Sequence, residues 1–176
     1  MSIEQHRKEA PRALGFALIT ISDTRTGPEQ GGKPDVGGDL LAASIVAAGH
    51  SVRHRDWSLD EAGPIEDSVW RALARADVDL LLTTGGTGIA PRDVTYTTLL
   101  RLFDSEIPGF GELFRWLSFR EIGSATILSR AVGGIVKGRV VLALPGSPKA
   151  LRLAMDEIVL KEAGHLVAQA RGPTAP

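Results

Sequence analysis

Apolar runs alternate with amphipathic stretches along this chain, and this alternation restricts the possible folds more than any other feature. The runs at residues 16–21 and 78–84 have the character of buried strands. Between them, apolar residues recur at helical spacing, first at Leu41 and Ile45 and then through residues 65–76. Strands joined through helices of ten or more residues pair in parallel, because the crossover must carry the chain back across the sheet. We therefore predict an α/β protein with three layers, in which helices cover both faces of a mostly parallel sheet.

The C-terminal part adds an antiparallel feature to this sheet. Residues 131–136 and 139–144 have strand character and flank Lys137-Gly138, a two-residue connection that favours a hairpin. A long helix is predicted from about Pro148 onward. The expected fold is thus a three-layer α/β/α domain with one antiparallel hairpin near its C-terminal end.

Other boundaries rest on turn residues and capping patterns. A Gly-rich loop is predicted at residues 26–38. Thr95 is expected to be the N-cap of the next helix. A helix at residues 110–117 is expected to be followed by a second, short one, because Ser118 and Glu121 have capping-box spacing.

Length and composition limit the class of protein. The 176 residues, 43% of them hydrophobic, suffice for one folded domain, which we place at 13–169 with disordered tails at 1–12 and 170–176. A formal net charge of −1 argues against a nucleic-acid binder that neutralises phosphates, and the lack of cysteine excludes disulfides and thiolate metal sites. No apolar run could span a membrane and the polar start lacks a signal-peptide core, so we expect a cytoplasmic protein.

The segment from Thr83 to Thr95 carries the strongest chemical signal. Ligands of parallel α/β sheets bind beyond the carboxyl ends of the strands, and this segment follows a buried strand there. Its glycines Gly85, Gly86 and Gly88 would let a phosphate approach the backbone N–H groups, with the Thr87 hydroxyl as a further donor. A carboxylate at Asp93 would repel that phosphate unless it held a divalent cation. A tight turn with Asp93 as a helix cap is the competing explanation.

Two other strand ends offer similar loops. Ser22 and Asp23 follow the first strand and can bind a phosphate or form a local turn. The loop before the last helix places backbone N–H groups at a helix N-terminus, which favours anions, or is a plain strand-to-helix turn. Its candidate residues are Pro145, Gly146 and Ser147.

Asp60 is a fourth candidate. It follows a weaker predicted strand at residues 52–57 and stands at the start of a helix, where it can also simply complement the helix dipole. We expect this strand and the one before Gly85 to be neighbours in the sheet, which would bring Asp60 and Asp93 close together.

Several motifs taken together resemble the molybdopterin-binding domain family. The segment Thr-Thr-Gly-Gly-Thr-Gly-x-x-x-Arg-Asp-Val-Thr at 83–95 is similar to its signature, and residues 107–112, 127–131 and 144–148 are similar to its later motifs, in the same order. The likeness extends from about residue 16 to 167. Residues 114–123 bring the chain closest to the branch that holds molybdenum cofactor biosynthesis protein B and the molybdopterin adenylyltransferases. Tyr96, where the family commonly has proline, and Gly37, where a serine is frequent, depart from the pattern.

The resemblance implies an enzyme of molybdenum cofactor biosynthesis. It would adenylylate molybdopterin with ATP and release pyrophosphate, with Asp60 and Asp93 as catalytic residues that hold Mg²⁺. The loop residues named above would bind the phosphates of the nucleotide and the pterin. The main alternative is a member of the same family that binds a pterin or assists assembly without catalysis. Thr87 and Arg92-Asp93 argue against a third possibility, the related domain of competence-damage-type nucleotide hydrolases.

The segment at 110–117 can pack in the core, which is the default explanation, or serve a subunit interface. Phe110, Phe114 and Leu117 form an apolar stripe that Leu113 and Trp116 widen, more than one short helix needs. The resemblance implies a homotrimer or a homohexamer.

Overall fold

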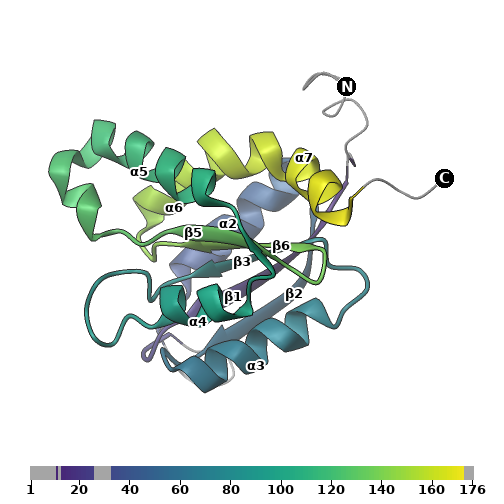
Figure 1. The fold of residues 1–176 in the computed structure, drawn as a ribbon, viewed down its shortest axis with the longest axis horizontal. Helices are drawn as coiled ribbons and strands as arrows, with labels where there is room; N and C mark the ends of the chain where they lie inside the picture. Colours follow the sequence, from purple (N-terminus) through teal and green to yellow (C-terminus); the bar gives the residue numbers. More distant parts are fainter. Residues whose placement is uncertain (1–10, 12, 26–32, 173–176) are drawn as a thin grey trace.

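The computed structural model describes residue 11 and residues 13–25 and 33–172, which form one three-layer α/β/α unit (Figure 1). The central sheet has six strands in the order β2-β1-β3-β6-β5-β4. Strands β2, β1, β3 and β6 run parallel, whereas β5 is antiparallel to both β6 and β4. The strands are β1 (Gly15–Ile21), β2 (Ser51–Ser58), β3 (Leu80–Thr84), β4 (Ser105–Glu106), β5 (Val132–Val136) and β6 (Arg139–Leu144). The predicted fold class is confirmed.

Helices cover both faces of the sheet because its strands are apolar on both faces (Figure 1). One face carries α2 (Val36–Ala47), α5 (Pro108–Ile122), α6 (Pro148–Ala154) and α7 (Leu160–Arg171). The other face carries α3 (Ala62–Leu73) and α4 (Thr95–Leu102). A 3₁₀ helix, η2 (Gly123–Leu128), follows α5, and a π-helical turn, η3 (Met155–Val159), joins α6 to α7.

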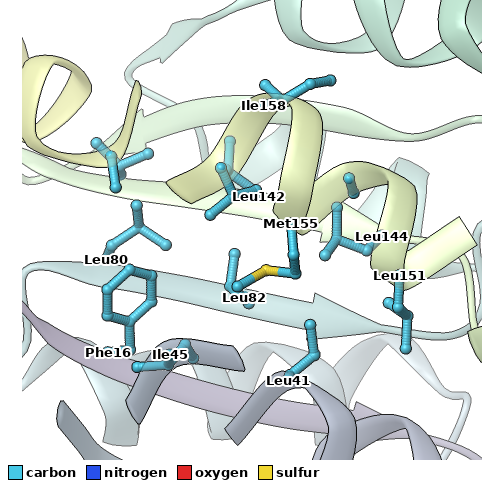
Figure 2. Packing of buried hydrophobic residues seen from close by; sticks show 14 of the residues in the cluster. Phe16, Leu41, Ile45, Leu80, Leu82, Leu142, Leu144, Leu151, Met155 and Ile158 are labelled. Carbon is cyan, nitrogen blue, oxygen red and sulfur yellow. The ribbon is translucent and has the colours of Figure 1, made fainter. Parts of the chain in front are cut away.

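Strand alternation divides the core into two clusters. In β1, Phe16 and Leu18 point into the cluster under α2 and α6, while Ala17 and Ile19 point toward α3. Figure 2 shows the first cluster, where Met155 packs among aliphatic side chains from β3, β6 and α2. The two cores hold the strands rigidly, so the loops at their carboxyl ends start from fixed positions.

The predicted hairpin is confirmed. Strands β5 and β6 pair with Val136 opposite Arg139, so the connection consists of two residues. Lys137 and Gly138 have φ values of 48° and 71°, and two positive values in succession are what a type I′ turn requires.

One predicted strand pairing and three predicted helix boundaries were wrong. Strand β1 lies between β2 and β3, so the strands before Asp60 and Gly85 are not neighbours. Helix α5 continues through Ser118, which is buried, and no new helix begins there. Thr95 is the first helical residue of α4 rather than its cap. Helix α2 begins at Val36, inside the predicted loop, because the Asp35 side chain accepts a hydrogen bond from the Gly38 N–H.

The last helix ends beyond the predicted C-terminal limit of the domain. Helix α7 extends through Arg171, two residues beyond the predicted boundary at 169. The predicted tails at residues 1–10, 12 and 173–176 lie outside the described residues. None of the described helices has the length and apolar character needed to cross a membrane.

Candidate active site

An open pocket of about 410 Å³ lies beyond the carboxyl ends of β3 and β6. One wall is made of loop residues singled out from the sequence: Gly85, Gly86, Thr87, Gly88, Asp93, Pro145, Gly146 and Ser147. The rest of the lining comes from α5, η2 and their surroundings and includes Phe114, Ile122, Ala125 and Leu128. The lining therefore combines loops that carry glycine and hydroxyl groups with apolar side chains, which suits a ligand that has both phosphates and a flat ring.

The three glycines of the loop are needed for different reasons. Gly85 has φ +108°, and a Cβ there would lie 2.2 Å from the carbonyl oxygen of Ile21 at the end of β1. A Cβ at Gly86 would lie 2.6 Å from Oδ1 of Asp60, and one at Gly88 would lie 2.6 Å from Oδ2 of Asp93. Gly85 thus joins the loop to the sheet, whereas Gly86 and Gly88 allow the two carboxylates to lie directly against its backbone.

Asp60 and Asp93 are brought to the same loop although their strands are not neighbours. The Ala90 N–H donates to Oδ2 of Asp93 at 2.9 Å, and the Val94 N–H donates a long hydrogen bond of 3.5 Å to Oδ1 of Asp60. Burial raises the pKa of Asp60, and the nearby charges of Asp93 and Asp23 raise it further. Negative charge is therefore concentrated at this edge of the pocket, where a cation would relieve the repulsion.

The donor set fits Mg²⁺ that arrives with phosphates rather than a closed metal cage. Within the described part of the chain, no cluster of three or more acidic, histidine or cysteine side chains could hold a metal by itself. Mg²⁺ commonly binds one or two carboxylates together with substrate phosphates and water. The buried Thr95 hydroxyl, which has no hydrogen-bond partner among the described residues, lies beside Asp60: a Cβ at Gly86 would be 2.2 Å from it.

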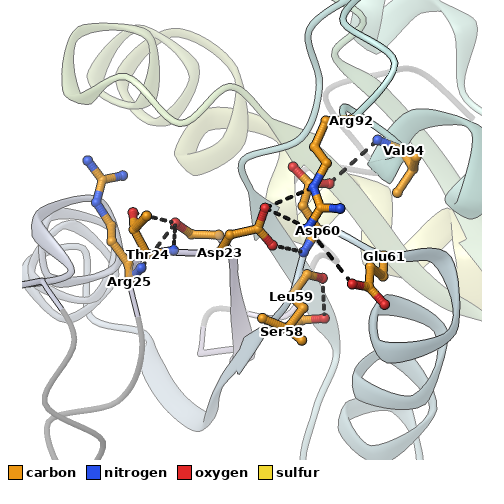
Figure 3. Close-up of polar contacts among 10 residues, drawn as sticks. Asp23, Thr24, Arg25, Ser58, Leu59, Asp60, Glu61, Arg92 and Val94 are labelled. Atoms are coloured by element: carbon orange, nitrogen blue, oxygen red, sulfur yellow. Dashed lines mark hydrogen bonds and ion pairs between the residues drawn. The ribbon is translucent and has the colours of Figure 1, made fainter.

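The first loop is tied to Arg92 by an ion pair and to the backbone of Asp60 by a hydrogen bond (Figure 3). Oδ2 of Asp23 accepts from Nε of Arg92 at 2.9 Å, and Oδ1 accepts from the Asp60 N–H at 3.2 Å. The hydrogen bond from Arg92 is the main cause of the lowered pKa of Asp23. Ser22 uses its hydroxyl oxygen to accept from the Arg25 N–H at 3.2 Å. Neither Ser22 nor Asp23 is among the residues that line the pocket, and Asp60 borders it through Gly86.

The last loop is joined to the glycine loop by two bonds. The Gly85 N–H donates to the Leu144 carbonyl at 3.1 Å, and the Thr84 hydroxyl donates to the Pro145 carbonyl at 3.3 Å. Ser147 is the N-cap of α6, where its side chain accepts from the Ala150 N–H at 3.2 Å. The two loops therefore form one continuous wall at the N-terminus of α6, as the parallel-sheet argument predicted.

The sequence does not identify two arginines of the site, Arg92 and Arg130, as functional candidates. Arg92 is adjacent to Asp93, and Arg130 lies in the motif at residues 127–131. Arg130 donates to the carbonyl oxygens of Gly88 and Asp93, at 2.7 and 2.6 Å. Residues so far apart in the chain leave no spacing signal in a single sequence, so only the folded structure reveals this contact.

The chain is similar in sequence to proteins of molybdenum cofactor biosynthesis. Residues 17–165 match a family model described as a probable molybdopterin binding domain. Molybdenum cofactor biosynthesis protein B of Halalkalibacterium halodurans is 46% identical over 168 residues, covering 95% of this chain and 96% of that protein. Molybdopterin adenylyltransferase of Pyrococcus furiosus is 37% identical over 175 residues, covering 97% and 99%.

Solved structures agree with these sequence matches. A crystal structure of a molybdenum cofactor biosynthesis protein B superposes with a TM-score of 0.85 at 43% identity, covering 92% of this chain and 98% of that one. A tungsten cofactor synthesizing protein from Pyrococcus furiosus superposes with a TM-score of 0.82 at 34% identity, covering 92% and 99%.

Proposed function

Because this chain belongs to the family of probable molybdopterin-binding domains, we propose that it is a cytoplasmic molybdopterin adenylyltransferase of molybdenum cofactor biosynthesis. The terminal phosphate of molybdopterin attacks the α-phosphorus of ATP, a new phosphorus–oxygen bond forms, and the bond to the β-phosphate breaks. The products are adenylylated molybdopterin and pyrophosphate. The attacking phosphate is already an anion, so the reaction needs positioning and charge neutralisation rather than a strong general base.

The observation that carries this proposal is the placement of two carboxylates against a glycine loop. Asp60 and Asp93 would hold Mg²⁺ with the nucleotide phosphates, and the metal would supply neutralisation of the charge that builds up on them. A carboxylate with a pKa raised by burial and by other acids is costly for the fold, which supports a functional reason for its presence.

The remaining residues would bind the substrates. The N–H groups of the glycine loop other than that of Gly85, with Thr87, would donate to phosphates, as would those at the start of α6, with Gly146 and Ser147. The exposed apolar side chains of the lining, Ile122 and Leu128, would pack against a flat ring of the nucleotide or the pterin. In the first loop, Asp23 would hold Arg92 and the Asp60 backbone in place. It would not contact a phosphate, because a carboxylate and a phosphate repel each other.

The rate of adenylyl transfer in an Asp93→Asn variant tests the assignment of Asp93 as a catalytic residue. The change keeps the side-chain shape and removes its charge, so we expect turnover to fall at least about 10²-fold. Molybdopterin binding should survive, because its main contacts would come from other loops. The matched control is Asp67→Asn, an exposed carboxylate on α3, which should leave turnover unchanged. Equal turnover in both variants would contradict the assignment of Asp93.

We also propose that the protein self-associates as a homotrimer or homohexamer. Of the predicted stripe, Phe110 and Phe114 are buried in the core, whereas Leu113 and Trp116 are exposed. Four large apolar side chains on α5 and η2 that do not line the pocket are between 42% and 75% exposed and contribute an apolar surface: Leu113, Trp116, Phe119 and Ile127. A surface of this kind is typical of subunit interfaces. Light scattering should report a stable oligomer at micromolar concentration, and Trp116→Glu should dissociate it. A monomeric wild type would refute the proposal.

A further inference from the structure

Arg130 binds both ends of the segment that carries Asp93. The residue lies between η2 and β5, and its own N–H donates to the Thr87 carbonyl at 2.9 Å. Its guanidinium donates from Nε to the Gly88 carbonyl at 2.7 Å and from a terminal nitrogen to the Asp93 carbonyl at 2.6 Å. One side chain therefore closes the loop from Gly88 to Asp93 in the manner of a fork.

Peptide geometry passes this contact on to both carboxylates. In a trans peptide the C=O and N–H groups point in opposite directions, so holding the Asp93 carbonyl directs the Val94 N–H to the other side. That N–H is the donor to Oδ1 of Asp60. At the other end of the fork, Gly88 is the residue whose backbone lies against the Asp93 carboxylate. Arg130 thus fixes the supports of Asp60 and Asp93 and is bonded to neither carboxylate.

The guanidinium is itself held in place by an aromatic ring. Its central carbon lies 5.1 Å from the ring centroid of Tyr96, in the first turn of α4. Such stacking orients the plane of the fork. Both acceptors of the guanidinium are neutral peptide oxygens, so these bonds leave its positive charge uncancelled beside the loop that would receive phosphate.

We propose that Arg130, held by Tyr96, is a positioning residue for adenylyl transfer that sets the geometry of Asp60 and Asp93 through the Gly88 and Asp93 peptide groups. This inference rests on the proposed function where turnover is measured, and on the carboxylate pair alone where metal binding is measured. A lysine at position 130 keeps the charge but replaces the rigid planar fork by a single nitrogen on a flexible stem. The fork and the charge can therefore be separated.

The kinetic test compares Arg130→Lys with wild type. Because supporting contacts of this kind affect activity by about 10–100-fold, we expect kcat to fall at least about 10-fold while the KM for molybdopterin changes less than about 3-fold. Tyr96→Phe keeps the ring and should behave as wild type, whereas Tyr96→Leu should lower kcat. The matched control is Arg115→Lys, since Arg115 also donates to a carbonyl, that of Ala131, but contacts no part of the glycine loop.

A double-mutant comparison separates positioning from a merely structural role. In an Asp93→Asn background, Arg130→Lys should lower turnover by a smaller factor than it does in the wild type, because one of the two charges that it positions is already gone. A loss that multiplies fully with that of Asp93→Asn would show that Arg130 acts by another route and would overturn the inference.

Metal binding provides a readout that does not depend on turnover. Mn²⁺ titrated by electron paramagnetic resonance, in the presence of a non-hydrolysable ATP analogue, should bind Arg130→Lys at least about 10-fold more weakly than wild type. Unchanged Mn²⁺ affinity would overturn the inference even if the wild type is active. If the wild type shows no turnover but Arg130→Lys binds Mn²⁺ more weakly than the wild type, the proposed function fails and the positioning role stands.

Discussion

Replacing Gly86 by alanine distinguishes a phosphate-binding loop from an ordinary tight turn. Gly86 has φ +62°, and an added Cβ would lie 2.2 Å from the Thr95 hydroxyl oxygen and 2.6 Å from Oδ1 of Asp60. Both obstacles are side-chain ends rather than backbone, so the chain can still fold by displacing them. One displaced group is the Asp60 carboxylate that would hold the metal, and the other is the Thr95 hydroxyl beside it.

The expected magnitude follows from two terms. A left-handed backbone costs an alanine about 1–2 kcal/mol. Forcing an extra methyl group into a packed site adds about 1–3 kcal/mol. The matched control is Gly49→Ala, which has φ +82° and nothing within 4 Å of the added Cβ, so it bears only the first term. Gly86→Ala should therefore be the less stable of the two variants by about 1–3 kcal/mol.

Urea denaturation and calorimetric titration with Mg·ATP check both parts. Gly49→Ala should bind Mg·ATP as wild type does, whereas Gly86→Ala, at a urea concentration where it is still folded, should bind at least about tenfold more weakly, a change of about 1.4 kcal/mol. The bulkier Gly86→Val should show the same effect more strongly. If folded Gly86→Ala kept wild-type affinity, the loop would be a turn without a role in nucleotide binding.

Two further predictions concern acids whose pKa values shift in opposite directions. Folding raises the pKa of Asp60, so ionisation of this side chain opposes folding as the pH rises. Asp60→Asn should therefore raise the free energy of unfolding at pH 7 by up to about 1 kcal/mol while it lowers turnover. A variant that is as stable as the wild type, or less stable, would contradict this prediction. Burial alone would raise the pKa of Asp35, but hydrogen bonds from Arg55, the Thr20 hydroxyl and the Gly38 N–H outweigh it and lower the pKa. Asp35→Ala should lower the free energy of unfolding by about 2–4 kcal/mol at pH 7, and this difference should shrink at low pH, where Asp35 of the wild type is protonated. The control is Asp39→Ala, which removes only an exposed partner of Arg55 and should lower the free energy of unfolding by less than about 1 kcal/mol in the same urea titrations.

The sheet and its ligand edge were predictable because they depend on local patterns. The apolar runs that became β1, β3 and β6 need no knowledge of tertiary structure, and the rule for parallel sheets then places their loops at one edge. The hairpin was equally local, since Lys137-Gly138 specifies its own turn. Most of the pocket wall at Gly85 to Gly88 and at Gly146 follows from these elements.

The remaining features depend on contacts between distant segments. The sequence gives no strand order, and β1 between β2 and β3 overturned the expected neighbours while leaving the two carboxylates together. Ser118 matched a capping box, but burial against the sheet kept α5 intact through it. The pairing of Arg92 with Asp23 and the fork of Arg130 join residues 37 or more positions apart, a separation at which no periodic pattern exists.

The most direct test of the central claim is the fate of labelled ATP. Wild-type protein incubated with molybdopterin, Mg²⁺ and ATP labelled at the α-phosphate should transfer the label to molybdopterin, and label at the γ-phosphate should appear in pyrophosphate in equal amount. Asp67→Asn should do the same and Asp93→Asn should not. If α-label stays in ATP while molybdopterin binds normally, the chain is a pterin-binding member of its family and not an adenylyltransferase.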